Sequence, residues 1–588
     1  MRPKFRSIIK WGFGVLLVLA LLSYVLFFYP FLGIPFNGQR QGNPPLTPAW
    51  ALECWLWEDD VNTAEYVDEL LAGYAEHDIP VRTIIIDSPW SLRYNDFEVD
   101  TLRYPESEKW FGRLQNDGYR VVLWLTSMVN ESSKDTHITN SKIWFDSIAE
   151  KGYVIGGSKP NKWWKGKGGF LDYTHPEARQ WWHAKQQPLL DWGIDGWKLD
   201  GAATLFWTEL GPLPLFYKKS HQGIISTRKY MNLYYRKEYE NGLKSSPDFV
   251  TLSRSMDRGY HPEGFAPIDA SPVNWVGDQE HQWKGSGEGD AKDKALDGVQ
   301  GFEAAIKSIL RSAKKGYSVI GSDVAGFSGG TIPPRLYMRW AQFSAFCGLF
   351  MNGGHGERRL WKRSQEELKV IRKFSWLHTE LVPYMYHYVH TAHTGGRRLQ
   401  TPLENGDYHY MFGEDFLVAP IYVDDTFREV SLPEGQWRYL FDDAALLGGN
   451  QNIKKDYPMD EFPVYVREGA IIPMNVSRDY TGFGDKASEG FRTYLMYPKA
   501  GTHRFTDYKE HGGSTEISYR LDNDELEVHM QGGISPHILR WHSAKPPKNI
   551  RMNGQFLDVS EWEYLSEAQK VVVKTCGQHQ ALRYLIQY

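Results

Sequence analysis

The sequence has few cysteines, no excess of basic charge and no H-x-H or H-E-x-x-H motif, and each of these shortages counts against a class of protein. Its 3 cysteines, Cys54, Cys347 and Cys576, lie far apart among 588 residues, so they cannot form a disulfide framework or a thiolate metal cluster. Lys and Arg number 67 against 72 Asp and Glu, which gives a net charge of −5. Because nucleic acid backbones are bound mainly by an excess of Lys and Arg, no nucleic acid partner is expected.

The composition is that of a folded chain with many aromatic rings. A hydrophobic share of 41% and a charged share of 24% exclude wholesale disorder. The chain holds 23 Trp, 34 Tyr and 29 Phe residues. Flat apolar rings fill cores and also suit the C–H faces of sugars, and composition alone favours the core.

The amino terminus is predicted to lie outside the fold. Arg2, Lys4, Arg6 and Lys10 precede Trp11–Phe36, a run of 26 residues without a charged side chain. That run exceeds the roughly 20 residues that a membrane-spanning helix needs. Basic residues before a span place the amino end in the cytoplasm. We therefore expect a single-pass membrane anchor with the rest of the chain periplasmic, extracellular or lumenal, and a cleaved signal peptide is the alternative.

Eight short β-rich runs alternate with helical patterns over about 350 residues, the number of repeats that a (β/α)8 barrel requires. Two of the helices between them are clear: one begins at Ala64, and another covers Phe302–Lys315 and ends at Gly316. The eight runs are Trp50–Trp57, Val81–Asp87, Tyr119–Thr126, Ile194–Asp200, Phe249–Ser255, Asn274–Asp278, Ser318–Asp323 and Gly348–Gly354.

Polar residues stand at or near the carboxyl ends of these runs. In a barrel those ends converge on one mouth, where the active site lies, although an aspartate at a strand end can also simply begin a turn. Two insertions, 204–239 and 256–272, are expected to enlarge this mouth. The residues at the strand ends are Asp87, Thr126, Asp200, Arg254, Asp278, Asp323 and His355.

From about Leu399 the helical patterns stop, and strand-like stretches alternate with Gly, Asp, Asn and Pro turns, which is typical of antiparallel sandwiches. The predicted fold is therefore α/β: a TIM barrel followed by C-terminal antiparallel β-sandwich domains, with an N-terminal transmembrane helix. The expected divisions are a basic tip and anchor at 1–37, a linker at 38–48, the barrel at 49–395, a proximal sandwich at 396–480 and a distal β domain at 481–588.

A barrel mouth that is rich in carboxylates and also holds Arg, His and Trp suits cleavage of a glycosidic bond. That reaction usually needs two carboxyl groups, one to protonate the leaving oxygen and one to attack or stabilise the sugar centre. Metal-dependent hydrolysis would favour His spacings such as H-x-H or H-E-x-x-H, and neither stands near the strand ends. We expect no metal and no cofactor.

Nine stretches, in order and at reasonable spacing, resemble glycoside hydrolase family 31, the retaining α-glucosidase and α-xylosidase family. The resemblance extends from about residue 50 to residue 475. The stretches are NDFEVDTLRYP (95–105), DYTHPEARQWW (172–182), GIDGWKLD (193–200), SRS (253–255), NWVGD (274–278), GSDVAGF (321–327), GGHG (353–356), LVAPIY (417–422) and PVYVREGAIIP (463–473).

The resemblance implies roles for two carboxylates. Asp200 matches the family's nucleophile, and Asp278 matches its general acid/base. A retaining pair stands about 5–5.5 Å apart, a spacing that neighbouring strand ends in a barrel can reach. Asp278 must start out protonated, which a partly apolar setting favours, and Trp275 is a candidate for that apolar wall.

Further residues resemble the family's substrate-binding positions. Each has a structural alternative, namely an ion pair, a hydrogen bond to a neighbouring loop, or core packing. Arg254 can orient carboxylates and sugar hydroxyls. A lysine at the position of Lys198 occurs in family members that include some α-xylosidases, and a cation there would keep Asp200 ionised. The other candidates are Asp87, Asp323 and His355 for hydroxyl binding, and Trp124, Trp163 and Trp164 for stacking on sugar.

Three departures from the family pattern bear on the substrate. Ala203 stands where a glutamate commonly follows the nucleophile by three positions. The family's usual amino-terminal β-sandwich is missing before residue 49, so we expect the site either to be more open or to be closed by the chain's own insertions. Finally, 261–272 separates Arg254 from Asp278 by more than the family pattern has.

These observations predict a membrane-anchored, exo-acting retaining α-glycosidase that hydrolyses terminal α-linked sugars of an oligosaccharide or glycoside. Its substrate is expected to be an α-glucoside, α-xyloside, α-galactoside or anionic α-glycoside. Two alternatives stay open: an exported carbohydrate-binding protein on a hydrolase scaffold without catalysis, and an α-transglycosidase. The oligomeric state is left open.

Overall fold

The computed structural model describes residues 3–25, 42–201, 217–255, 266–284 and 300–588. Within it the chain divides into two compact units. The first comprises residues 1–42, 61–65 and 85–271, and the second comprises 43–60, 66–84 and 272–588.

Eight parallel strands form the barrel sheet in the order β12-β11-β10-β7-β3-β2-β1-β13. An isolated parallel bridge between Asp323 and Met351 links the two edges of this order, so the barrel is nearly closed. Each strand lies within one of the eight predicted runs or overlaps it, which confirms the barrel prediction. The strands are β1 (Cys54–Leu56), β2 (Thr83–Ile86), β3 (Arg120–Leu125), β7 (Gly196–Leu199), β10 (Val250–Arg254), β11 (Val273–Trp275), β12 (Ile320–Gly321) and β13 (Phe350–Asn352).

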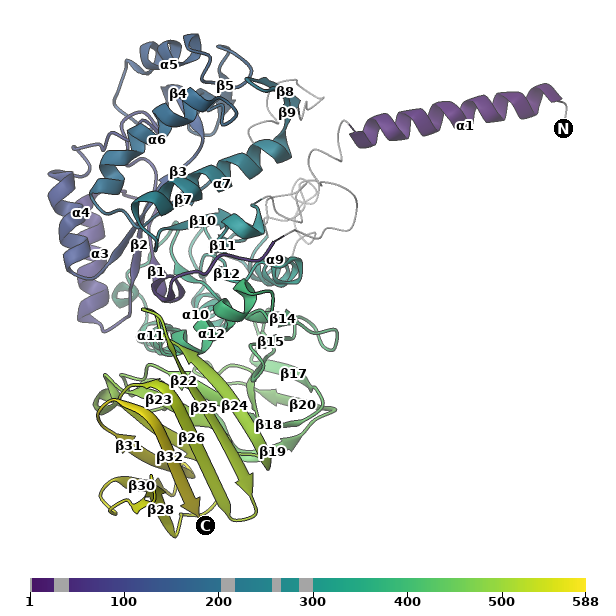
Figure 1. The fold of residues 1–588 in the computed structure, drawn as a ribbon. Coiled ribbons are helices and arrows are strands. Elements are labelled where there is room, and N and C mark those ends of the chain that lie inside the picture. The colour runs from purple at the N-terminus through teal and green to yellow at the C-terminus, as the bar shows by residue number, and fades with distance from the viewer. Residues whose placement is uncertain (1–2, 26–41, 202–216, 256–265, 285–299) are drawn as a thin grey trace. The chain divides into compact units, whose positions relative to one another are not determined.

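Helices follow the strands along the chain, as βα repeats require (Figure 1). The helix predicted to begin at Ala64 is α3, whose residues Val67, Leu70 and Tyr74 form a buried stripe at helical spacing. The second predicted helix is α9, and Gly316 ends it with a φ of 120°. The helices are α3 (Ala64–Glu76), α4 (Ser107–Asn116), α5 (Ser141–Glu150), α6 (Pro176–Asp191), α7 (Thr227–Ser245), α9 (Phe302–Lys315), α10 (Pro334–Ser344), α11 (Gln365–Glu380) and α12 (Val382–His393), with short 3-10 turns η2 (Ala49–Leu52), η4 (Ile268–Ala270) and η5 (Leu360–Lys362).

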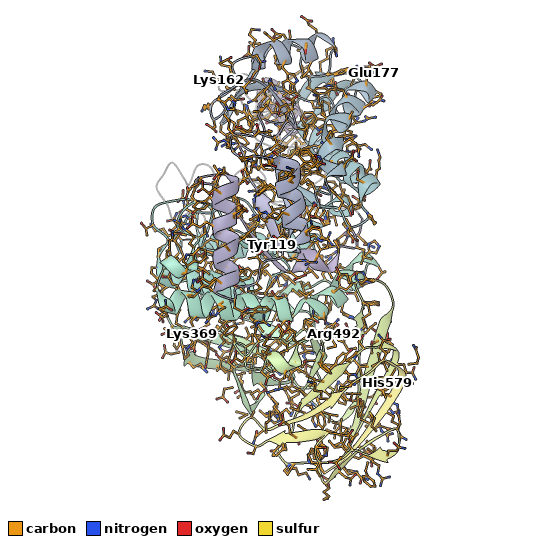
Figure 2. The ribbon with its side chains drawn as sticks, turned by 90° about the vertical axis from the view of Figure 1, so that its left-hand side faces the viewer. Tyr119, Lys162, Glu177, Lys369, Arg492 and His579 are labelled. Atoms are coloured by element: carbon orange, nitrogen blue, oxygen red, sulfur yellow. The ribbon has the colours of Figure 1, made fainter. Side chains whose placement is uncertain are left out.

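An excursion between β3 and α6, which the sequence did not predict, carries α5 and a three-stranded sheet of order β4-β6-β5. Its strands are β4 (Met128–Ser133), β5 (Asn161–Trp163) and β6 (Gly166–Phe170), and Figure 2 labels Lys162 on β5. The sequence GKGGF of β6 lacks β-branched residues, so it gives little strand signal.

The insertion predicted over 204–239 is too long. Residues 202–216 lie outside the described residues, and β8 (Tyr217–Ser220) and β9 (Gly223–Ser226) then form a hairpin. The barrel helix α7 already begins at Thr227. Of the second predicted insertion, 256–265 also lies outside the described residues.

Beyond α12 the described chain is built from antiparallel strands, apart from the short η6 (Lys486–Ser488) and a parallel pairing of β23 with β27. The sheets have the orders β14-β15-β16-β21-β18-β19, β17-β20, β22-β23-β27-β31-β30 and β24-β25-β26-β32-β28-β29. The carboxyl terminus follows β32 in the last of these sheets (Figure 1). The strands are β14 (Gln400–Pro402), β15 (Tyr410–Phe412), β16 (Phe416–Val418), β17 (Phe427–Leu432), β18 (Gln436–Tyr439), β19 (Asp442–Gly448), β20 (Gln451–Asp456), β21 (Val464–Arg467), β22 (Ile471–Met474), β23 (Arg492–Met496), β24 (Gly501–Tyr508), β25 (Ser514–Asp522), β26 (Glu525–Ile534), β27 (His537–His542), β28 (Asn549–Met552), β29 (Gln555–Phe556), β30 (Trp562–Leu565), β31 (Lys570–Thr575) and β32 (His579–Gln587).

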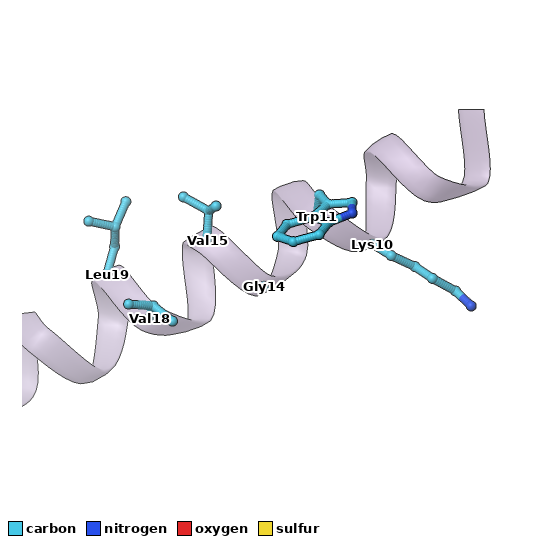
Figure 3. Close-up of a pocket in the computed structure, with 6 residues that line it drawn as sticks. All are labelled: Lys10, Trp11, Gly14, Val15, Val18 and Leu19. Atoms are coloured by element: carbon cyan, nitrogen blue, oxygen red, sulfur yellow. The ribbon is translucent and has the colours of Figure 1, made fainter. Parts of the chain in front are cut away.

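The amino-terminal helix α1 spans Pro3–Ser23. Among the described residues, no helix combines the length and the apolar character that crossing a membrane takes, so the predicted transmembrane helix is not found there. Of the predicted span Trp11–Phe36, residues 26–36 lie outside the described residues. The described residues that line a hollow of about 480 Å³ all belong to α1, and they include Trp11, Val15 and Leu19 (Figure 3).

Two helical glycines allow a test of the packing around the barrel. A Cβ on Gly73 of α3 would stand 2.1 Å from Cη2 of Trp361, whereas a Cβ on Gly112 of α4 would meet nothing within 4 Å. We expect Gly73→Ala to lower the free energy of unfolding by about 1–3 kcal/mol, because overpacking outweighs the gain in helix propensity. Gly112→Ala should raise it by about 0.5–1 kcal/mol. Urea denaturation of both variants would show this, and equal changes of the same sign would contradict it.

Candidate active site

The Asp200 carboxylate lies at the carboxyl end of β7 and is held by donors on both oxygens. Its Oδ1 accepts hydrogen bonds from Nη2 of Arg254 at 2.7 Å, from Nε of Arg254 at 3.2 Å, and from the backbone N–H of Gly201 at 2.7 Å. Its Oδ2 accepts one from the indole nitrogen of Trp124 at 3.2 Å. The side chain retains 16% exposure, so a reacting atom can reach it. These donors stabilise the ionised carboxylate and fix its orientation.

Arg254 reaches Asp200 because it is the last residue of β10, which runs parallel to β7. Two of its nitrogens contact the same carboxylate oxygen, so the planar guanidinium is fixed in one orientation. This agrees with the predicted ability of Arg254 to orient a carboxylate.

Lys198 shares the inner face of β7 with Asp200, because residues two apart in a strand point to the same side. Its Nζ donates to Oδ2 of Asp87 at 2.7 Å, and both side chains are almost fully buried, at 6% and 5% exposure. The other oxygen of Asp87 accepts from the N–H of Ser88 at 2.7 Å. Lys198 therefore neutralises Asp87, in addition to the predicted influence on Asp200.

Three tryptophans predicted to stack on sugar differ in their placement. Trp124 is buried and donates to Asp200, and Trp163 stacks on Trp124 with ring centroids 6.4 Å apart and an interplanar angle of 13°. Both therefore form the wall behind the carboxylate. Trp164 is 42% exposed, and a Cβ on Gly201 would stand 2.4 Å from its Cη2. Of the three, Trp164 is the ring with a face available to a ligand.

A strained loop after β2, which the sequence did not single out, holds the end of β3. Tyr94, Asn95 and Phe97 all have left-handed φ values, between 47° and 61°. Asn95 accepts from the N–H of Thr126 at 3.0 Å and donates to the carbonyl of Met128 at 2.6 Å. Residues 95–105 matched the family pattern, so that match was the available signal for this loop.

Behind Asp200 lies a buried polar network that the sequence analysis also missed. The Tyr234 hydroxyl donates to the carbonyl of Asp200 at 3.2 Å. One turn further along α7, the buried Glu238 accepts from Trp182 at 2.8 Å, from Gln186 at 2.7 Å and from the hydroxyl of Tyr173. No regular spacing in the sequence marks these partners, because they come from different elements.

Asp323 and His355 lie in the second compact unit, on either side of an aromatic pair. Oδ1 of Asp323 accepts from the indole nitrogen of Trp57 at 3.1 Å, and Trp57 stacks on Phe327 at 5.8 Å. The ring of His355 stands 4.9 Å from that of Phe327. Gly353 makes room for Trp57, since a Cβ there would be 1.8 Å from its Cδ1. Asp323 is almost fully buried, so little of its carboxylate is exposed to a ligand.

His355 is clamped by carboxylates from the loop after β1. Its Nδ1 lies 2.7 Å from Oδ1 of Asp60, and its Nε2 lies 3.4 Å from Oδ2 of Asp59. The second oxygen of Asp60 accepts from the N–H of Gly356 at 2.9 Å. The side chain is 40% exposed, so His355 can still meet a ligand. Within the described ranges, no group of three or more His, Cys, Asp and Glu side chains is arranged to hold a metal ion.

The predicted acid/base, Asp278, is half-buried and follows Gly277, whose φ is 99°. Trp275, the proposed apolar wall, is fully buried in β11. Arg358 is a further buried cation that the sequence did not reveal, and it donates to the carbonyls of Val324 at 2.6 Å and Gly326 at 2.8 Å. The spacing of Asp278 from Asp200 stays a prediction.

The sequence pattern described as the "Glycosyl hydrolases family 31 TIM-barrel domain" matches residues 44–388. The chain belongs to glycoside hydrolase family 31. The family's C-terminal domain matches residues 381–472. The family that the nine motifs predicted is therefore confirmed over more than half of the chain.

Individual members of family 31 are distant from this chain. An α-xylosidase of Emericella nidulans is 26% identical over 465 residues, which cover 74% of this chain and 54% of that protein. Alpha-glucosidase 2 of Bacillus thermoamyloliquefaciens is 24% identical over 83% of this chain and 62% of its own length. The chain thus spans less than two thirds of either relative. The structure of a family 31 dextranase of Flavobacterium johnsoniae, 21% identical, superposes with a TM-score of 0.79 over 93% of this chain and 72% of that one, which supports the fold.

The ion pair between Lys198 and Asp87 yields a test of stability. Removing one partner leaves an uncompensated buried charge, so we expect Asp87→Leu to lower the free energy of unfolding by about 3–5 kcal/mol. The double variant Asp87→Leu/Lys198→Met removes both charges and should recover most of that loss. Urea denaturation of the single and double variants measures the coupling, and additive losses would contradict it.

Glu238 makes stability depend on pH. Burial raises the pKa of Glu238 to about 7 from its ordinary value of 4.5. Between these values the folded chain keeps a proton that the unfolded chain has lost, so this group's contribution to stability declines as the pH rises from about 4.5 to 7. Glu238→Gln should remove that decline. Urea denaturation at several pH values compares the two proteins, and a pH-independent difference between them would contradict the assignment.

Proposed function

We propose that this member of family 31 is an exo-acting retaining α-glycosidase with Asp200 as nucleophile and Asp278 as general acid/base. The observation that carries the proposal is the Asp200 carboxylate, which is held on both oxygens by Arg254, Gly201 and Trp124. A nucleophile must be oriented and reachable; the donors fix the orientation of this carboxylate, and its side chain is 16% exposed.

In the first step, an oxygen of Asp200 attacks the anomeric carbon while Asp278 protonates the departing glycosidic oxygen. Oδ2, which has the single indole donor, is the better placed of the two oxygens, because Oδ1 carries three hydrogen bonds. The donors on Oδ1 hold the carboxylate while the bond forms. The product is a covalent glycosyl–enzyme ester and a free leaving-group alcohol.

In the second step, Asp278 is a carboxylate and takes a proton from water as the water attacks the anomeric carbon of the ester. Asp200 leaves as a carboxylate, and its Oδ2 can again accept the hydrogen bond from Trp124. Two inversions give net retention of the anomeric configuration.

The proposed substrate is a terminal α-glucosyl or α-xylosyl unit. Lys198 and Asp87 supply a charged, buried pair next to β7 that can bind sugar hydroxyls. The two curated relatives named above are an α-xylosidase and an α-glucosidase, which supports this range. Trp164 offers an exposed ring for stacking on a sugar.

The two carboxylate variants distinguish the proposed roles. Asp200→Asn should abolish turnover of every substrate, because no nucleophile remains. Asp278→Asn should lower kcat/KM by about 10²–10⁴-fold on aryl glycosides with a poor leaving group, and far less on those with an activated one. Steady-state kinetics on a panel of aryl α-glycosides measures both effects. Equal losses for Asp278→Asn on good and poor leaving groups would remove Asp278 from its role.

The same panel separates the alternatives. NMR of the first-formed product should show the α-anomer, and the β-anomer would contradict the double displacement. Binding of intact oligosaccharide without release of sugar would favour a carbohydrate-binding protein without catalysis. New glycosides in place of free sugar, formed when acceptors are abundant, would favour a transglycosidase.

We also propose that the amino-terminal segment attaches the chain to a membrane, with the barrel outside the cytoplasm. The support is the uncharged run Trp11–Phe36, which follows four basic residues. Fractionation of producing cells should recover the full chain with membranes after alkaline extraction, and a version that begins at residue 42 in the soluble fraction. Recovery of the full chain as a soluble protein would contradict the proposal.

A further inference from the structure

A polar groove of about 390 Å³ lies between α6 and α7, two helices of the first compact unit. It is lined at helical spacing by Pro176, Arg179 and His183 from α6 and by Lys237, Asn241 and Lys244 from α7. Each helix therefore presents a polar stripe to the other, where two packed helices usually present apolar ones.

The groove holds more positive than negative charge. Lys237 is paired with Glu240, which also lines the groove, at 2.6 Å. Nη1 of Arg179 donates to the carbonyl of Tyr173 at 2.5 Å, a neutral partner. Among the described residues, neither Arg179 nor Lys244 forms an ion pair. The positive charges of Arg179 and Lys244 are therefore not balanced by a carboxylate of the groove.

His183 brings an unsatisfied polar atom to the same groove. Its Nε2 is buried and has no hydrogen-bond partner in the part of the chain that the structure describes. Burial, together with Lys244, Arg179 and Lys237, lowers the pKa of His183 to about 4, so the ring is neutral near pH 7. Glu240 is the carboxylate of the groove that opposes these cations. A bound anion would balance the charges of Arg179 and Lys244, and the His183 ring that lines the groove would lie beside it.

We propose that the α6–α7 groove binds a small tetrahedral oxyanion, phosphate or sulfate, through Arg179 and Lys244. The guanidinium of Arg179 matches two oxygens of such a group, the ammonium of Lys244 balances its charge, and the ring of His183 lines the same groove. The groove lies between helices and not at the carboxyl ends of the barrel strands, so this site is separate from the one that would bind sugar.

Occupancy of the groove should stiffen the helix pair. Asn241 donates to Oε1 of Gln186 at 2.9 Å, and Gln186 donates to the buried Glu238 at 2.7 Å. The groove is thereby connected to the buried Glu238. Because a ligand that binds the folded state stabilises it, phosphate should raise the Tm of the chain.

The test is a titration of the full chain at pH 7 with inorganic phosphate, followed by calorimetry and by the Tm, with potassium chloride at matched ionic strength as reference. We expect one saturable site and a rise in Tm with phosphate but not with chloride. The same titration with sulfate in place of phosphate shows which of the two oxyanions binds more tightly. Arg179→Gln/Lys244→Gln should weaken binding by about tenfold or more, because each change removes a charge-assisted contact.

The matched control is Lys185→Gln/Lys229→Gln, which removes one cation from each of the same helices outside the groove. It should bind phosphate as the unmodified chain does. NMR of the histidine rings adds a direct readout: phosphate should raise the pKa of one imidazole from about 4, and His183→Gln should remove that signal. Weak binding that both double variants lower equally would indicate an adventitious ion only, and it would overturn the proposal. Absence of saturable binding would overturn it as well.

Discussion

The hydrogen bonds to the Asp200 carboxylate are the constraint on which the candidate site depends. Their donors come from three neighbouring parallel strands: Trp124 from β3, Gly201 just after β7, and Arg254 from β10. Parallel strands in register bring their carboxyl ends to one level, so the barrel itself sets the distances between these donors and the carboxylate. The neighbouring pair of Lys198 and Asp87 adds no net charge, and Arg254 is a cation that contacts the Asp200 carboxylate.

Much of this architecture could be predicted from the sequence because the barrel strands are buried on both faces. Such strands read as continuous apolar runs that end in a polar residue, and β3 (RVVLWL) and β2 (TIII) are examples. The roles suggested for Asp200 and Arg254 rested on resemblance, and their contact agrees with it. By contrast, β6 has the sequence GKGGF, and its place is set by pairing with β4 and β5, so no local pattern marked it.

The features that the sequence did not reveal depend on contacts between distant segments. The hydrogen bond between Asp60 and His355 joins residues 295 positions apart. The bonds from Arg358 to Val324 and Gly326 join the loop after β13 to the loop after β12. The type of a single residue can also suggest a role that its surroundings do not support. Trp124 has the residue type that stacks on sugars, yet its ring is buried and its indole nitrogen donates to Asp200.

The position of Trp164 has a consequence for how such an enzyme can diverge. Its exposed ring lies over Gly201 but is carried by the excursion between β3 and α6, whereas the carboxylate and its donors come from barrel strands and the turn after β7. Changes in the length or sequence of the excursion can therefore remodel the ligand-facing surface independently of the reacting group. The exposed ring and the Asp200 carboxylate are encoded in separable stretches of the gene, so selection can alter one while it preserves the other.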